Sequence, residues 1–171
     1  MMLVQLGQPR ASDDVVALLL ACHGRIRTFL GMAGRLATTQ ASGREIGEAA
    51  GQISRYFADA FPLHVADEDR SIAPRLARDA AVAEVLAAMQ RDHAAHAPGI
   101  ASLVALCGVL ERDPSQRPAL ARELGAAAAA LAAELDAHLA LEEHAIFPAI
   151  LRLPRGEQEA IRSEIRTRRR P

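Results

Sequence analysis

Residues 64–74 read HVADEDRSIAP, and residues 138–148 read HLALEEHAIFP. At matching positions, 74 residues apart, the two stretches share a His, a Glu four residues later, a second acid after that Glu, an Ile and a Pro. A His and a Glu four residues apart lie on the same face of a helix, and a single such pair is common at protein surfaces. Two copies, each on the apolar stripe of its helix and each ending in Pro, indicate instead a shared chemical role.

The sequence on either side of both stretches predicts helices, because apolar residues recur every three or four positions. Residues 12–14 are typical of a helix start, and Ser42 with Glu45 forms a capping box. We expect Pro62 and Pro98 to bend the helices that contain them. The predicted helices cover about residues 12–40, 42–78, 79–111 and 116–152.

Four long helices joined by short turns form an up-down-up-down bundle. We therefore predict an all-α fold, a four-helix bundle over residues 12–153, preceded by an N-terminal arm over residues 1–11. Residues 154–171 leave room for a short fifth helix and a basic tail. We expect the basic run at residues 166–170 to be a solvated tail, because no aromatic residues are interleaved with it.

The composition is typical of one globular domain: 171 residues, half of them apolar, 3% aromatic and 24% charged. The 20 basic residues are all Arg, and 21 acidic residues leave a net charge of −1, which gives no overall attraction to nucleic acid or anionic lipid. No signal peptide and no membrane span are predicted. Cys22 and Cys107 do not form a Cys-x-x-Cys pair, and we expect a cytoplasmic, reduced protein.

The remaining helices also carry a His on the apolar stripe, His23 in the first and His93 in the third. Counted from the turns at about 1.5 Å per residue, both fall near the level of His64 and His138. Burying four imidazoles and the two repeat glutamates is costly unless something pairs with them, and a metal cluster pairs with all of them. Imidazole with carboxylate suits iron, manganese or zinc, and the absence of inward thiolates argues against a structural Cys zinc site.

This pattern resembles the hemerythrin family, and within it the bacterial HHE cation-binding domains, over about residues 12–153. The resemblance implies a non-haem di-iron centre with bridging carboxylates and one open iron position that takes dioxygen. The implied bridges are Glu68 and Glu142, and the histidines are the implied terminal ligands. The full set of metal ligands predicted in this way is His23, His64, Glu68, His93, His96, His138 and Glu142.

The sequence departs from the family's oxygen carriers at two ligand positions. The carriers have a second third-helix His four residues after the first, where this chain has Ala97, so we assign the nearby His96 instead. The carriers' fourth-helix carboxylate corresponds to Glu143, whereas the internal repeat favours Glu142. His144 lies off the apolar stripe, and we expect it to be exposed.

Four further side chains near these ligands are expected to play supporting roles. Asp67 and Asp69 are predicted to be acids beside the site or in solvent. Cys22 is predicted to be a small buried hydrophobe, and Tyr56 to be a packing residue.

The leading functional hypothesis is a small di-iron protein that binds or senses dioxygen or a related small oxidant, with no catalytic residue assigned. Manganese and zinc are the alternative metals. The second hypothesis is detoxification of peroxide or nitric oxide, or the storage or delivery of iron. The third is a metal-free helical interaction module in which His and Glu form buried salt links. A protein partner or a homo-oligomer is compatible with each of them.

Overall fold

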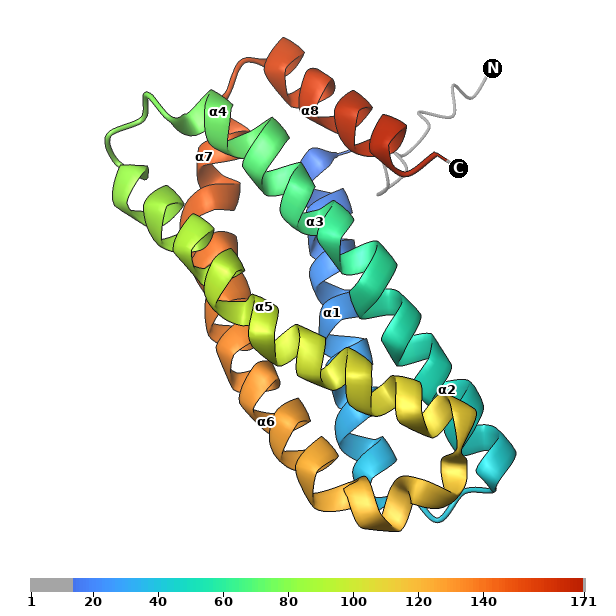
Figure 1. Cartoon of the computed structure of the whole chain (residues 1–171). Coiled ribbons are helices and arrows are strands. Elements are labelled where there is room, and N and C mark those ends of the chain that lie inside the picture. The colour runs from blue at the N-terminus through green and yellow to red at the C-terminus, as the bar shows by residue number, and fades with distance from the viewer. Residues whose placement is uncertain (1–13, 171) are drawn as a thin grey trace, which may run out of the picture.

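The computed structural model describes residues 14–170, and within that range it contains helices and no strand. Four long helical segments lie side by side and alternate in direction (Figure 1). α1 packs against α2 and α6, and α5 packs against the same two helices. The predicted all-α four-helix bundle with a fifth C-terminal helix is confirmed. The elements are α1 (Val15–Thr38), α2 (Gly43–Arg55), η1 (Tyr56–Ala60), α3 (Phe61–Asp67), η2 (Glu68–Ile72), α4 (Ala73–Leu76), α5 (Ala83–Arg112), η3 (Pro114–Gln116), α6 (Arg117–Leu141), η4 (Glu142–Ile146), α7 (Phe147–Arg152) and α8 (Arg155–Arg168).

The helix starts follow local capping rules. The Asp14 side chain accepts a hydrogen bond from the Val16 backbone N–H at the start of α1. The predicted capping box between Ser42 and Glu45 is present at the start of α2. The predicted arm over residues 1–11 and the first part of the predicted helix start lie outside the described residues.

Three five-residue π-turns interrupt the second and fourth long helices, each one directly before a helix with Pro at its second position. Pro lacks a backbone N–H and clashes with the carbonyl four residues earlier, so a wider turn before it relieves the conflict. η2 begins at Glu68 and η4 at Glu142, and in both the residue before the Pro donates its N–H to that glutamate's carbonyl. The two copies of the repeat therefore share the same backbone conformation. The second long helix also continues past Pro62 without a break, as predicted.

The apolar core consists of two clusters with a polar layer between them. One cluster includes Ile26 and Leu103, and the other includes Leu19 and Met89. On α1, His23 lies between Leu19 of one cluster and Ile26 of the other. On each of the other long helices, the ligand side chains likewise lie between residues of the two clusters. The buried His and Glu side chains therefore lie at one level of the bundle.

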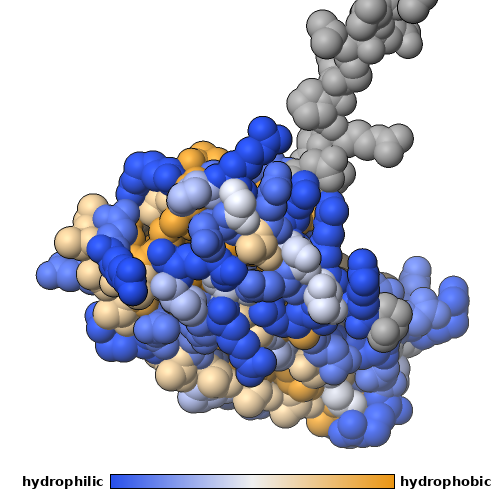
Figure 2. Space-filling view, turned by 90° about the horizontal axis from the view of Figure 1, so that it is seen from above, coloured by the Kyte–Doolittle hydropathy of each residue, from blue (hydrophilic) through white to orange (hydrophobic). Residues whose placement is uncertain are grey.

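α8 covers one end of the bundle, where it packs against α1, α3 and η2 (Figure 1). Its Ile161 and Ile165 are buried in the second apolar cluster. Figure 2 shows this end of the molecule, where hydrophilic side chains predominate and hydrophobic ones gather in smaller patches. The expectation that the basic run is a solvated tail is wrong, because Arg168 and Arg169 contact the buried carboxylate of Asp67.

Three described helical segments are long and apolar enough, by length and hydropathy alone, to cross a membrane. They are Val15–Thr38, Ala83–Arg112 and Pro114–Arg152. The same segments carry buried polar side chains, among them His23 and His138. The absence of a membrane span stays a prediction from the sequence.

Candidate metal centre

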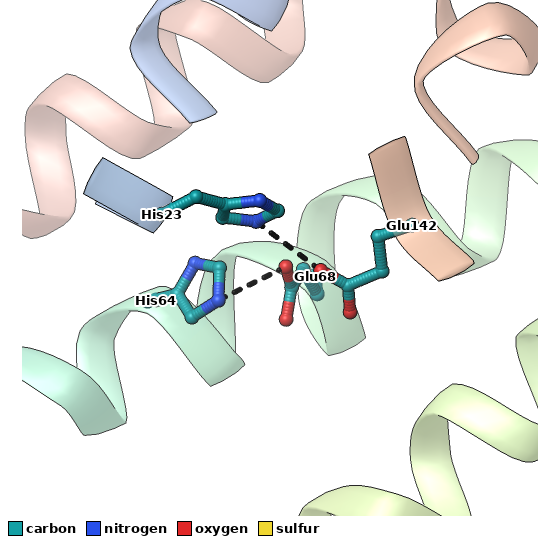
Figure 3. Close-up of side chains that lie close together, drawn as sticks. All are labelled: His23, His64, Glu68 and Glu142. Carbon is teal, nitrogen blue, oxygen red and sulfur yellow. Dashed lines mark ion pairs between the residues drawn. The ribbon is translucent and has the colours of Figure 1, made fainter. Parts of the chain in front are cut away.

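The polar layer brings six side chains together from the four long helices. Figure 3 shows four of them, His23, His64, Glu68 and Glu142, with their polar ends pointing toward one another. The six form two groups in which the potential ligand atoms all lie within 4.8 Å of one another. One group is His23, His64, Glu68 and Glu142, and the other is Glu68, His93, His138 and Glu142.

The two glutamates belong to both groups, and each divides its two oxygens between them. Glu68 Oε1 lies 3.2 Å from His64 Nε2, and its Oε2 lies 3.1 Å from His93 Nε2. Glu142 Oε2 lies 3.2 Å from His23 Nε2, and its Oε1 lies 2.8 Å from the Nε2 of the fourth histidine, His138. Each carboxylate therefore faces one histidine of each group.

Most of these buried atoms lack a hydrogen-bond partner. Within residues 14–170, the Nε2 atoms of His23, His64 and His93 have none, nor do the carboxylate oxygens of Glu68 and Glu142. They approach one another closely, but without the geometry of a hydrogen bond. Buried polar atoms in folded proteins are nearly always satisfied, so a cluster of unsatisfied ligand atoms favours a bound cation at its centre.

The protonation states of the site fit the same conclusion. Burial lowers the pKa of His64 to about 3, which keeps its imidazole neutral. Burial raises the pKa of Glu68 well above its ordinary value, and the nearby Glu142 carboxylate raises it further. Burial also raises the pKa of Glu142, but His138 and His23 beside it prevail and lower it. Two adjacent glutamates, one of which resists ionisation in the metal-free site, gain from a positive charge placed between them, and a metal ion supplies that charge.

Three of the four histidines have an acid at the ring nitrogen that faces away from the shared glutamates. An acid in this position holds Nδ1 protonated and leaves the Nε2 lone pair for a metal, as is usual for histidine ligands. Among the described residues, His64 Nδ1 has no such partner. The three pairs are His23 Nδ1 with Glu143 Oε1 at 2.8 Å, His93 Nδ1 with Asp69 Oδ1 at 3.2 Å, and His138 Nδ1 with Asp92 Oδ2 at 3.3 Å.

Neutralising these acids is expected to weaken metal binding without abolishing it. Asp69→Asn, Asp92→Asn and Glu143→Gln should each lower the affinity by about 10- to 100-fold, because the histidine behind each loses its orientation and basicity. Competition with a metal chelator measures the change. Glu123→Gln, at an exposed position on α6, is the control. Wild-type affinity in all three variants would contradict the role assigned to the acids.

The structure brings all the predicted ligands except His96 into the two groups. His96 is buried, and its ring lies edge-on to His138 with the centroids 5.1 Å apart, but it belongs to neither group. Glu142 rather than Glu143 belongs to both groups. Sequence reasoning missed Asp92, because it stands next to His93 on α5 but contacts a histidine on α6.

Two of the predicted supporting residues, Asp67 and Cys22, have partners that were not predicted. Asp67 is fully buried, but its partners are Arg168 at the end of α8 and Arg169 directly after it, rather than the ligands or solvent. Cys22 is buried as expected, but its Sγ also accepts hydrogen bonds from two guanidinium groups. Tyr56 packs as expected, stacked on Phe29 with the ring centroids 4.0 Å apart, and His144 is exposed.

Comparison with known proteins agrees with this geometry. A family model described as the hemerythrin HHE cation binding domain matches residues 14–150, a range that includes all six side chains of the two groups and ends before α8. No curated protein matches the chain. The matched model covers most of the chain, and the site that it spans holds the His and Glu side chains that a cation requires. The chain therefore belongs to the hemerythrin HHE cation-binding domain family.

Proposed function

We propose that this protein is a non-haem di-iron protein that binds or senses dioxygen or a related small oxidant. One observation carries the proposal: Glu68 and Glu142 are shared by two ligand groups, and each offers one oxygen to each group. Two carboxylates arranged in this way suit a pair of metal ions that they bridge, with two histidines as terminal ligands of each ion. A single ion would leave half of these donors unused.

The donor set favours iron, with manganese and zinc as alternatives. Imidazole with carboxylate suits all three, and neither cysteine belongs to the described ligand groups. The resemblance of the sequence to the hemerythrin family, which implies a di-iron centre, makes iron our choice. Each ion would have four protein donors, which leaves positions for a small ligand on a six-coordinate ion.

When bound, a pair of ferrous ions supplies the electrons that a small oxidant accepts. The chain's own contribution is to orient the ligands and to keep water away from them. The ring of Phe147 lies against His23 with the centroids 5.0 Å apart, and Phe61 lies 5.9 Å from His64. The two apolar clusters enclose the polar layer from both sides along the bundle. An enclosed site of this kind slows the loss of a bound oxidant to water.

Metal analysis followed by exposure to air tests the proposal. Protein purified without oxygen, or reconstituted with ferrous iron, is assayed for metal by mass spectrometry, and its visible spectrum is recorded as air is admitted. We expect two iron ions per chain and new absorption bands that fade when oxygen is removed. Iron that oxidises once and does not revert would favour oxidant detoxification or iron storage and delivery instead. Failure to retain any metal would contradict the proposal and favour a metal-free helical module.

A further inference from the structure

Asp67 is a buried carboxylate that belongs to neither ligand group. It lies on α3 immediately before Glu68, and its side chain is fully buried. Its oxygens contact the guanidinium groups of Arg168 and Arg169, which lie at the end of α8 about one hundred residues later in the chain. A buried carboxylate without a partner is strongly unfavourable. The two guanidinium groups provide partners for the Asp67 carboxylate and so make its burial tolerable.

Arg169 also contacts a second helix. The guanidinium nitrogen that donates to Asp67 Oδ2 donates as well to Cys22 Sγ on α1, at 3.0 Å. Cys22 immediately precedes His23, just as Asp67 immediately precedes Glu68. One guanidinium group therefore joins α1 to α3 at the level where each carries a predicted metal ligand.

The docking of α8 does not depend on this contact. Ile161 and Ile165 are buried in the second apolar cluster. Arg75 forms ion pairs with Glu164 at 2.7 Å and with Glu157 at 2.8 Å. Removing the Arg169 guanidinium therefore leaves α8 in place. It takes away the link between the two ligand-bearing helices and leaves Asp67 paired with Arg168.

We propose that Arg169 is a positioning residue for the metal centre, which fixes His23 relative to Glu68 by contacting Cys22 and Asp67 together. The inference rests on the proposed function, because it assumes that the two groups hold metal. Arg169 lies beyond residues 14–150, the part of the chain that the family model matches. The contact that it makes with Cys22 and Asp67 is therefore provided by a segment outside the matched domain. Because the contact couples α8 to the ligands, bound metal also stabilises the end of α8 against local opening.

Metal release from the full chain tests the proposal. Wild type, Arg169→Gln and Cys22→Ala are loaded with ferrous iron without oxygen, and release to a chromogenic chelator is followed by absorbance. We expect release to be about tenfold faster in Arg169→Gln, within the range found for residues that orient metal ligands. Cys22→Ala keeps both arginines on Asp67 and removes the contact of Arg169 with α1, together with a hydrogen bond from Arg25 within α1. Iron release from this variant should therefore be accelerated by a smaller factor. The same variant also provides the test if Arg169→Gln does not fold.

Two substitutions separate positioning from a general loss of stability. Arg155→Gln makes the same replacement on α8 at an exposed position, and Arg75→Gln weakens the docking of α8 without touching a residue next to His23 or Glu68. Both should release iron at the wild-type rate, even where thermal unfolding shows that Arg75→Gln lowers the melting temperature of the metal-free protein. Equal acceleration by Arg75→Gln, or wild-type release in both Arg169→Gln and Cys22→Ala, would overturn the positioning role alone. Wild-type protein that takes up no iron would overturn the proposed function with it.

Discussion

Glu68→Gln is expected to abolish metal binding and to stabilise the metal-free protein, whereas Glu142→Gln is expected to abolish metal binding and to destabilise it. Both substitutions remove a shared carboxylate from the two groups. Their effects on the metal-free fold differ because the pKa of Glu68 is raised and that of Glu142 is lowered. The fold therefore disfavours ionised Glu68 and favours ionised Glu142.

The direction of each change in the stability of the metal-free protein follows from proton linkage. A carboxyl with a raised pKa in the folded state costs stability as the pH rises through its titration, so a neutral amide of the same shape relieves that cost at pH 7. The substitution of Glu142 lowers the stability instead, because the ionised carboxylate interacts with His138 and His23 and an amide loses that attraction. Each change should be on the order of 2 kcal/mol, the scale found when buried charges are replaced. For a chain of this size that corresponds to about 6 °C in melting temperature.

Thermal unfolding of the metal-free variants at pH 7, together with metal titration, measures both effects. Glu143→Gln serves as the matched control, since it is a neighbouring carboxyl that contacts His23 but belongs to neither group. It should retain metal with reduced affinity. If Glu68→Gln and Glu142→Gln shift the melting temperature in the same direction, the account of the metal-free site is incorrect.

The fold and the level of the site follow from local sequence features. The helical period, the capping box at Ser42 and the repeated His–Glu–Pro pattern each act over a few residues, and counting residues from the turns was enough to place the histidines at one level. The π-turns at Glu68 and Glu142 were not predicted, although Pro74 and Pro148 provide a local reason for them.

The parts that the sequence did not reveal depend on contacts between distant segments. Arg168 and Arg169 read as a solvated tail, because nothing near them in the sequence indicates a buried partner. Their contact with Asp67 depends on how α8 packs across the end of the bundle. Asp92 was overlooked for the same reason, since its partner His138 lies on a different helix.

Metal binding is expected to stabilise the fold strongly, and the gain should shrink as the pH falls. A ligand at 1,000 times its dissociation constant stabilises the state that it binds by about 4 kcal/mol, which corresponds to about 12 °C in this chain. Two ligands account for the pH dependence. Burial lowers the pKa of His138, but Glu142 and Asp92 beside it prevail and raise it, and the pKa of Glu68 is also raised. Both side chains must lose a proton before they bind metal, so protons compete with the metal below neutral pH.

His64 affects the stability of the metal-free protein, through protonation of the unfolded chain. Its pKa is about 3 in the folded protein, where burial keeps it neutral, against 6.5 for an ordinary His. Between these values the unfolded chain binds a proton that the folded chain does not, so the metal-free protein loses stability as the pH falls through this window. His64 itself, already neutral at pH 5.5, does not make metal binding pH-dependent there.

Thermal unfolding with and without ferrous iron, in the absence of oxygen at pH 5.5, 6.5 and 7.5, separates the two contributions. In the metal-free protein the His64 contribution lowers the melting temperature toward pH 5.5, whereas protonation of Glu68 and His138 opposes it. The increment that iron adds to the melting temperature should fall toward pH 5.5. The double variant Glu68→Gln/Glu142→Gln should show no increment at any of the three values. An increment of the same size in that variant would mean that iron stabilises the protein from a site elsewhere. An increment that stays constant from pH 7.5 to 5.5 would mean that metal binding displaces no proton from His138 or Glu68.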